Sequence, residues 1–333
     1  MAKKIAINGF GRIGRSFLRA LLLDEKASKD LNVVAINIGP GKMEQTALLF
    51  QYDSVMGQFK NKVKYLNNSL IIGNKEIKIL SELDPEKLPW SSFNIDWVVE
   101  ATGKFTQRSK AQLHLKAGAK KILITAPAKG EDVTIIPGIN DSEYKSENLI
   151  VSLGSCTTNC FAPMIKVIDE NFDLISGLMT TIHAYTNTQV LLDVQDSDPR
   201  RARAAAINLI PTSTGADKVI TKLYPQYRDK LQALAVRAPI PIVSLIDFTF
   251  DTKDYLTVEL INDVFKRYSQ NQLKGILQYC EEPLVSSDFE QNSHSCIIDS
   301  LLTKSNGKMH KIFGWYDNEF GYSCRLKDFL LHN

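Results

Sequence analysis

Short apolar runs and amphipathic stretches alternate along the first half of the chain. Residues 4–8 and 32–37 are short runs that are apolar between polar ends, which is typical of buried strands. Between them, over 13–21, apolar side chains recur at helical spacing. Two more apolar runs, 96–102 and 121–125, continue the alternation. This half is therefore expected to form a sheet with helices between its strands.

The second half opens with a longer amphipathic stretch. Five apolar side chains share one helical face: Phe161, Met164, Ile165, Ile168 and Phe172. Pro163 lies within this stretch, and its ring is expected to kink the first turn of the helix. Residues 174–182 then predict a strand that ends at His183.

A glycine-rich segment links the first strand to the first helix. Residues 9–14 read Gly-Phe-Gly-Arg-Ile-Gly. A strand, G-x-G-x-x-G, a helix and a second strand together form the dinucleotide-binding fingerprint. Gly9, Gly11 and Gly14 let the backbone approach a pyrophosphate at the start of the helix. Thr125 ends a later strand, where it either contacts the cofactor or closes a loop.

The acidic residue that usually ends the second strand is missing. That residue binds the adenosine ribose hydroxyls, but the chain has Asn37, Ile38 and Gly39 there. Ile38 can neither accept a hydrogen bond from the ribose nor repel a ribose phosphate. The hypothesis is that NAD specificity is relaxed and that NADP is accepted as well.

Residues 155–160, Ser-Cys-Thr-Thr-Asn-Cys, place a thiol at the predicted start of the second-half helix. Free backbone N–H groups and the positive end of the helix dipole favour a thiolate there. A cysteine in such a place titrates at about 3.5 to 7.5, against about 8.5 when unperturbed. Cys156 is therefore a candidate nucleophile with a lowered pKa. Cys160, one turn later, is expected in the core.

Basic side chains supply candidate partners for this thiol and for an anion. His183 is the kind of residue that activates a thiol, although a structural histidine is the alternative and spacing cannot show the pairing. Residues 200–203, Arg-Arg-Ala-Arg, form the densest positive cluster. Arginine suits phosphate, and a solvated or intersubunit surface is the alternative. Arg237 and the segment 213–215 would add anion donors.

Composition narrows the class of protein. The chain has 333 residues, 44% of them hydrophobic and 23% charged, which suffices for two globular domains. A net charge of +3 and the lack of stacking aromatics near the arginines argue against nucleic acid as the main partner. Five cysteines without a paired framework, and no signal or membrane-spanning stretch, predict a cytoplasmic protein with no membrane partner. No metal site is expected.

A thiol nucleophile, a dinucleotide fold and several anion donors together predict the oxidation of an aldehyde. The thiolate adds to the aldehyde and forms a hemithioacetal. Loss of hydride to the cofactor leaves a thioester, which a second nucleophile cleaves. His183 takes the thiol proton and assists the hydride step.

Seven segments also match one known family: Ile7-Asn8-Gly9-Phe10-Gly11-Arg12-Ile13-Gly14-Arg15, Tyr52-Asp53-Ser54-Val55, Ser155-Cys156-Thr157-Thr158-Asn159-Cys160, His183-Ala184-Tyr185-Thr186-Asn187, Arg200-Arg201-Ala202-Arg203-Ala204-Ala205, Ile210-Pro211-Thr212-Ser213-Thr214-Gly215-Ala216 and Trp315-Tyr316-Asp317-Asn318-Glu319. On these segments the chain resembles the phosphorylating glyceraldehyde-3-phosphate dehydrogenases, over nearly its whole length. The resemblance implies an α/β fold with a Rossmann dinucleotide-binding domain, 1–155, and an α+β catalytic domain with a mixed sheet, 156–320. A C-terminal helix, 321–333, is implied to pack back on the first domain, and the family is typically homotetrameric.

The resemblance also implies roles for matching residues. Cys156 is implied to be the nucleophile and His183 its base. The phosphate of the substrate is implied to contact Thr186, Arg201 and Arg237. Inorganic phosphate is implied to contact Ser155, Thr157, Thr214 and Gly215. The implied cofactor contacts are Gly9, Gly11, Arg12, Ile13, Gly14, Thr125, Asn187 and Asn318.

The implied reaction converts D-glyceraldehyde 3-phosphate and inorganic phosphate to 1,3-bisphosphoglycerate with NAD, in glycolysis or gluconeogenesis. One alternative is a close relative, erythrose-4-phosphate dehydrogenase, which releases the acid by hydrolysis. Thr186 argues against it, because that relative usually alters this segment. An alternative of another class is a protein that binds RNA or a protein partner through the cofactor fold.

Overall fold

The computed structural model describes residues 2–333, which divide into two compact units. Unit 1 comprises residues 2–137, Asp141–Gly154 and Ser323–Asn333, and unit 2 comprises Gly138–Asn140 and Ser155–Tyr322. Each unit has its own main sheet and its own buried apolar core. The mixture of sheets and helices confirms the predicted α/β class.

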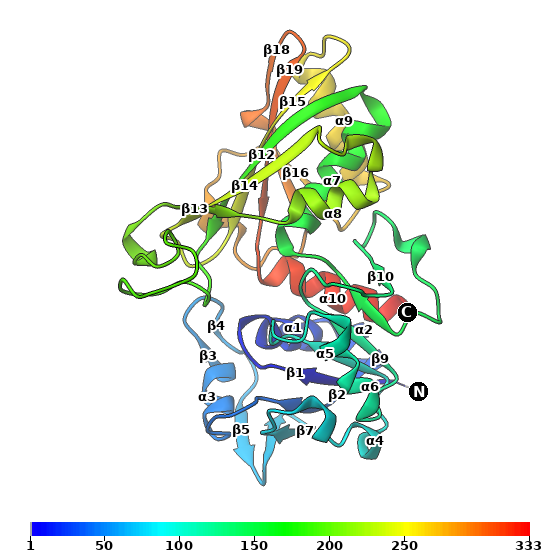
Figure 1. Ribbon diagram of the computed structural model, residues 1–333, viewed down its shortest axis with the longest axis vertical. Coiled ribbons are helices and arrows are strands. Elements are labelled where there is room, and N and C mark those ends of the chain that lie inside the picture. Colours follow the sequence, from blue (N-terminus) through cyan, green and yellow to red (C-terminus); the bar gives the residue numbers. More distant parts are fainter. Residues whose placement is uncertain (1) are drawn as a thin grey trace. The chain divides into compact units, whose positions relative to one another are not determined.

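The main sheet of unit 1 has nine strands in the order β10-β11-β9-β8-β1-β2-β7-β6-β5 (Figure 1). The strands of this unit are β1 (Lys3–Asn8), β2 (Leu31–Asn37), β3 (Tyr52–Asp53), β4 (Gly57–Gln58), β5 (Val63–Leu66), β6 (Ser69–Ile72), β7 (Lys75–Leu80), β8 (Trp97–Glu100), β9 (Lys121–Ile124), β10 (Val133–Thr134) and β11 (Ile150–Ser152). Neighbours are parallel from β10 to β7, and β6 and β5 add two antiparallel pairs. β3 and β4 pair separately.

Helices connect these parallel strands, as a parallel sheet requires. They are α1 (Arg12–Leu23), α2 (Glu25–Asp30), α3 (Gln45–Gln51), α4 (Trp90–Phe93), α5 (Arg108–Ala111) and α6 (Leu113–Lys116), with 3-10 turns η1 (Pro85–Lys87) and η2 (Asp141–Glu143). The predicted strands at 4–8, 32–37 and 121–125 agree with β1, β2 and β9 to within one residue. The strand predicted over 96–102 is shorter, because the chain turns after β8 and Gly103 adopts a left-handed φ of 71°.

The C-terminal helix, α10 (Phe320–His332), contributes its residues from Ser323 onward to unit 1. There the Phe329 ring lies edge-on to Trp97 and Tyr144, with centroids 5.6 and 5.2 Å away. Aromatic pairs of this geometry stabilise beyond their buried area. This end of the helix is therefore part of the core of unit 1.

Unit 2 contains a mixed sheet in the order β13-β14-β12-β15-β19-β17-β16, with β18 paired to β19. Its strands are β12 (Leu174–Ala184), β13 (Ile210–Ser213), β14 (Leu231–Ala238), β15 (Ser244–Thr252), β16 (Leu277–Cys280), β17 (Cys296–Asp299), β18 (Lys304–Asn306) and β19 (Met309–Tyr316). Its helices are α7 (Cys156–Asn171), α8 (Ala216–Leu223) and α9 (Val258–Gln270), with 3-10 turns η3 (Ala205–Ile207), η4 (Pro225–Tyr227), η5 (Ser286–Phe289) and η6 (Ser300–Leu302). All three α-helices lie along one side of the sheet (Figure 1).

Helix α7 is the central helix of unit 2 and contacts β12, β15, β17 and β19. Its Phe161 ring is fully buried and meets Phe248 edge-on at a centroid distance of 4.9 Å. The helix is continuous past Pro163, so the predicted kink does not interrupt it. Cys160 is fully buried, as predicted.

Across residues 2–333, helices fall short of the length and apolarity needed to cross a bilayer.

Truncation of Phe329 to alanine is expected to lower the free energy of unfolding by about 3 to 5 kcal/mol, because a large buried side chain is removed. Urea titration followed by circular dichroism measures the change. His332→Ala is the matched control on the same helix, since His332 is exposed and its loss is expected to cost no more than about 0.5 kcal/mol. Equal losses in the two variants would contradict this account of α10.

Candidate active site

A crevice of about 380 Å³ in unit 1 lies where β1 and β2 end. Gly11 precedes α1 and faces open space, since a Cβ built there meets no atom within 4 Å. No side chain caps this helix, so its start is free to receive an anion. The other two glycines allow close packing: a Cβ on Gly9 would lie 2.7 Å from the Thr102 nitrogen, and one on Gly14 would lie 2.2 Å from the Gly9 oxygen. The residues present thus fit a dinucleotide.

The residues that line the crevice come from four segments. They are Asn8, Gly9, Phe10, Gly11, Asn37, Ile38, Gly39, Pro40, Glu82, Leu83, Ala101, Thr102, Lys104 and Phe105. Two predicted cofactor contacts, Gly9 and Gly11, are among them. Arg12, Ile13 and Gly14 form the first turn of α1 just beyond. Thr125 is not a lining residue, and its Oγ1 donates to the Glu100 carbonyl at 3.1 Å.

An ion pair missed in the sequence holds the first turn of α1. The Arg12 guanidinium donates to Asp53 Oδ2 at 2.5 Å, and Asp53 is 8% exposed. Burial raises the pKa of Asp53, but hydrogen bonds from Arg12 and from the N–H groups of Met56 and Val55 lower it more, to about 2. Asp53 therefore stays charged and orients Arg12.

A buried polar network missed in the sequence lies beneath the same crevice. Asn8 Nδ2 donates to Glu100 Oε2 at 2.6 Å, and Asn37 Nδ2 donates to Asn8 Oδ1 at 2.7 Å. Trp90 Nε1 donates to His114 Nδ1 at 3.0 Å, so the His114 proton is on Nε2, which faces Glu100 Oε2 at 3.1 Å. The buried carboxylate thus receives donors and fixes the ends of β1 and β2.

In unit 2, Cys156 is the first residue of α7. Ser155 caps this helix, because its Oγ accepts the Thr158 N–H at 3.1 Å. The Cys156 sulfur lies 3.5 Å from His183 Nε2. All five cysteines are free; Cys156 is half-buried and the other four are buried. The structure therefore brings together the two residues that the sequence could not pair.

Strand register places Arg237 beside this pair. β12 and β14 are parallel, and His183 stands opposite Arg237 in the ladder. His183 Nδ1 lies 2.7 Å from the Ala184 oxygen, which accepts a hydrogen bond from Arg237 Nη1 at 3.2 Å, and Nδ1 and Nη1 are 2.5 Å apart. In the tautomer with its proton on Nδ1, the ring donates to that carbonyl and the Nε2 lone pair faces the sulfur. Burial and the charge of Arg237 lower the pKa of His183 to about 3. The imidazole is therefore neutral and can accept a proton.

The pKa of the Cys156 thiol is shifted in the direction opposite to the one predicted from the sequence. Burial raises the pKa of Cys156, and the charge of Arg237 together with hydrogen bonds from Thr157 offsets only part of that effect. The expected lowering of the pKa is wrong for this structure, because desolvation outweighs the start of the helix. Thiol and imidazole both rest neutral, so a proton must move between them to make the nucleophile.

Three buried hydroxyl groups extend from the start of α7. Thr157 Oγ1 lies 3.0 Å from the Tyr316 hydroxyl, which lies 2.7 Å from Thr181 Oγ1. Burial and the nearby Cys156 raise the pKa of Tyr316 well above its usual range. The Tyr316 hydroxyl therefore keeps its proton. Thr157 itself is buried, at 4% exposed.

The other predicted anion donors lie on loops and strand ends of unit 2. Arg201 Nε donates to Thr212 Oγ1 at 2.8 Å. Thr186 Oγ1 lies 2.8 Å from Thr188 Oγ1, and Asn187 follows it on an exposed turn. Thr214 Oγ1 accepts the Ala216 N–H at 3.3 Å. Gly215 precedes α8 and, like Gly11, faces open space.

A strained residue helps to place Asn318. Val243 is fully buried with φ 64°, a left-handed conformation that costs a β-branched residue about 1–3 kcal/mol. The next residue, Ser244, accepts the Ala184 N–H at 3.1 Å and donates to Asn318 Oδ1 at 3.0 Å. The strained turn therefore links the strand end that carries His183 to Asn318.

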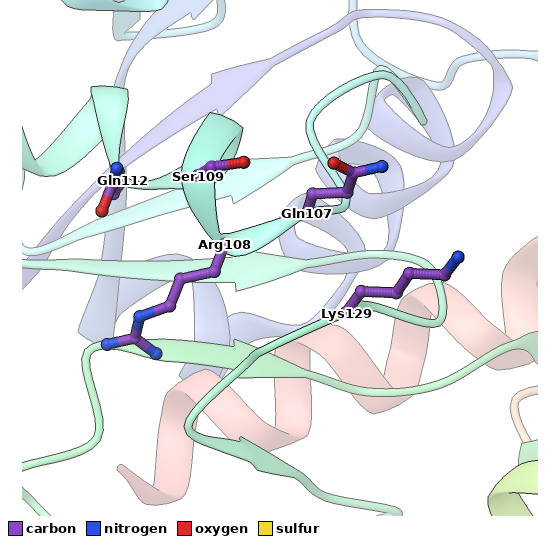
Figure 2. Close-up of a pocket in the computed structure, with 5 residues that line it drawn as sticks. All are labelled: Gln107, Arg108, Ser109, Gln112 and Lys129. Atoms are coloured by element: carbon purple, nitrogen blue, oxygen red, sulfur yellow. The ribbon is translucent and has the colours of Figure 1, made fainter.

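A second hollow, of about 480 Å³, offers no comparable chemistry. It is lined by Gln107, Arg108, Ser109, Gln112 and Lys129. Figure 2 shows that these side chains extend in different directions and do not converge on a common centre. Within residues 2–333, no group of three or more His, Cys, Asp or Glu side chains could hold a metal ion.

Comparison with known proteins gives two family matches and many close relatives. Residues 3–108 match the family described as glyceraldehyde 3-phosphate dehydrogenase, NAD binding domain, and residues 155–318 match the corresponding C-terminal domain. The chain is 47% identical over 334 residues to glyceraldehyde-3-phosphate dehydrogenase 2 of Bacillus subtilis, covering 100% of this chain and 97% of the relative. It is 48% identical over 328 residues to glyceraldehyde-3-phosphate dehydrogenase of Thermotoga maritima, covering 98% of each.

Replacement of Arg237 by glutamine is expected to raise the pKa of the Cys156 thiol, because the guanidinium charge lowers it. The rate of iodoacetamide alkylation at Cys156, followed against pH, should move its midpoint upward by about one unit. Arg203→Gln is the matched control, since Arg203 is exposed and pairs with Asp193. An unchanged or lower midpoint in Arg237→Gln would rule out this electrostatic role.

Proposed function

This chain belongs to the glyceraldehyde-3-phosphate dehydrogenase family, and we propose that it oxidises D-glyceraldehyde 3-phosphate to 1,3-bisphosphoglycerate with NAD and inorganic phosphate. The observation that carries the proposal is the Cys156 sulfur 3.5 Å from His183 Nε2, beside Arg237. We also propose two domains, 1–155 and 156–320, with the helix 321–333 on the first, and action in the cytoplasm, where free cysteines persist.

The first chemical step is activation of the thiol. The aldehyde substrate carries a phosphate, for which Arg201, Arg237 and Thr186 are the proposed donors. A substrate phosphate bound at Arg237 screens the guanidinium charge that lowers the pKa of His183. The pKa of His183 therefore rises as substrate binds, and its imidazole becomes a stronger base than in the free protein. His183 Nε2 then takes the proton of Cys156, the thiolate sulfur bonds to the aldehyde carbon, and the imidazolium returns the proton to the aldehyde oxygen to give a hemithioacetal.

The second step oxidises the hemithioacetal to a thioester. A nicotinamide cofactor, when bound, supplies the hydride acceptor. Gly9, Gly11 and the first turn of α1, with Arg12, Ile13 and Gly14, are proposed to hold it, and Thr125, Asn187 and Asn318 are proposed as further contacts. His183 takes the hydroxyl proton of the hemithioacetal as its carbon–oxygen double bond forms.

The third step releases the acyl group to phosphate. An oxygen of inorganic phosphate attacks the thioester carbon, the carbon–sulfur bond breaks, and the thiolate of Cys156 is regenerated. Ser155, Thr157, Thr214 and Gly215 are the proposed donors to this phosphate. The open space above Gly215, at the start of α8, suits an anion.

Replacement of Cys156 by serine is expected to abolish dehydrogenase activity, because the hydroxyl is not a comparable nucleophile. The reduction of NAD with glyceraldehyde 3-phosphate, with and without phosphate, measures this in the purified protein. Cys280→Ser is the matched control, since Cys280 is buried and its sulfur contacts the Glu282 oxygen. The control should retain activity.

The same assay separates the alternatives. Turnover that depends strictly on phosphate supports phosphorolysis, whereas turnover of erythrose 4-phosphate without phosphate would indicate the hydrolytic relative. A wild-type protein without any dehydrogenase activity would instead favour a binding protein for RNA or a protein partner.

We propose that the protein is a homotetramer, because unit 2 exposes large apolar side chains. Six large apolar side chains there are exposed: Leu178, Leu191, Leu192, Ile207, Leu209 and Leu234. Leu191 and Ile207 are 83% and 79% exposed, more than an isolated subunit in water favours. Copies of the chain that cover one another would bury these groups.

The wild-type protein is expected to sediment with the mass of four chains. Leu178→Asp should shift it to smaller species, because a carboxylate would then be desolvated in the interface. Leu260→Asp on α9, at a site 46% exposed, is the control and should leave the mass unchanged. A monomeric wild type would contradict the proposal.

A further inference from the structure

The cofactor crevice contains a carboxylate that the sequence pattern did not reveal. Of its described lining residues, Glu82 is the only acid and Lys104 the only base. Glu82 follows β7 and is 44 positions beyond Ile38 in the chain. Both nevertheless line the same crevice. An acid thus lies close to the place where the usual ribose-binding acid is missing.

The pairing of β2 with β7 brings Glu82 to this place. Asn37, the last residue of β2, accepts the Glu82 N–H at Oδ1 and donates from Nδ2 to the Glu82 oxygen, both at 2.9 Å. The Ile38 N–H donates to the Leu80 oxygen at 2.9 Å. Asn37 is itself held by the buried network at Asn8. The backbone of Glu82 is therefore fixed to the end of β2.

The side chain of Glu82 is also held. Its Oε1 accepts the N–H groups of Leu83 and Asp84 at 2.8 and 2.9 Å. Its Oε2 has no hydrogen bond to any residue within 2–333. The side chain is half-buried. A positioned carboxylate with one uncommitted oxygen can accept a hydrogen bond from a sugar hydroxyl.

We propose that Glu82 is the residue that selects NAD over NADP. Its carboxylate accepts a hydrogen bond from the adenosine ribose 2′-hydroxyl of NAD and repels the 2′-phosphate of NADP. The inference rests on the proposed function in one respect, since a nicotinamide dinucleotide must occupy this crevice. It predicts the opposite of the relaxed specificity expected from Ile38 alone.

Glu82→Gln tests the charge without disturbing the turn, because the glutamine carbonyl still accepts the Leu83 and Asp84 N–H groups. Isothermal titration of the full-length protein with NAD and with NADP gives the ratio of dissociation constants. The wild type should prefer NAD by at least about a hundredfold, and Glu82→Gln should reduce that ratio at least about tenfold. Adding Ile38→Asp to Glu82→Gln should restore the preference, because the carboxylate returns from β2.

Titration with AMP and with adenosine 2′,5′-bisphosphate confines the measurement to the adenosine half of the cofactor. Glu86→Gln is the matched control, since Glu86 lies outside the crevice lining. A ratio that changes by less than about twofold in Glu82→Gln overturns this inference while leaving the proposed function standing. Failure of the wild type to bind either dinucleotide would instead overturn the proposed function and this inference with it.

Discussion

The parallel pairing of β12 with β14 is the constraint on which the chemistry of unit 2 depends. It sets His183 opposite Arg237, so one guanidinium acts at once on the imidazole and on the thiol of Cys156. A slip of one residue would turn a strand's side chains to the other face of the sheet. The base, the anion donor and the electrostatics of the nucleophile therefore share a single structural cause.

Strand pairing has the same importance in unit 1. Asn37, the last residue of β2, donates to Asn8, which in turn donates to the buried Glu100. Asn37 also forms two hydrogen bonds with the backbone of Glu82. The glycines supply the room for a dinucleotide, whereas these polar contacts determine which groups face it. A site that lacks the usual acid on one strand thus receives a carboxylate from the next.

Local features were the ones that the sequence predicted well. The runs that became β1, β2 and β9 are short, with uninterrupted apolar residues over 5–7, 33–36 and 122–124, and Ser155 caps the start of α7. The pairing of Cys156 with His183 and the position of Glu82 could not be predicted from spacing, because strand register is not encoded locally. The raised pKa of the Cys156 thiol was missed for a related reason, since desolvation depends on the packing around α7 rather than on its first turn.

The central claim is that Cys156, beside the register-paired His183 and Arg237, carries the acyl group. Its most direct test is mass spectrometry of peptides after the protein reacts with glyceraldehyde 3-phosphate and NAD without inorganic phosphate. The account predicts a 3-phosphoglyceroyl adduct on the peptide that contains Cys156, removed when phosphate is added. An unmodified Cys156 peptide in a protein that turns over, or an adduct at another cysteine, would contradict it.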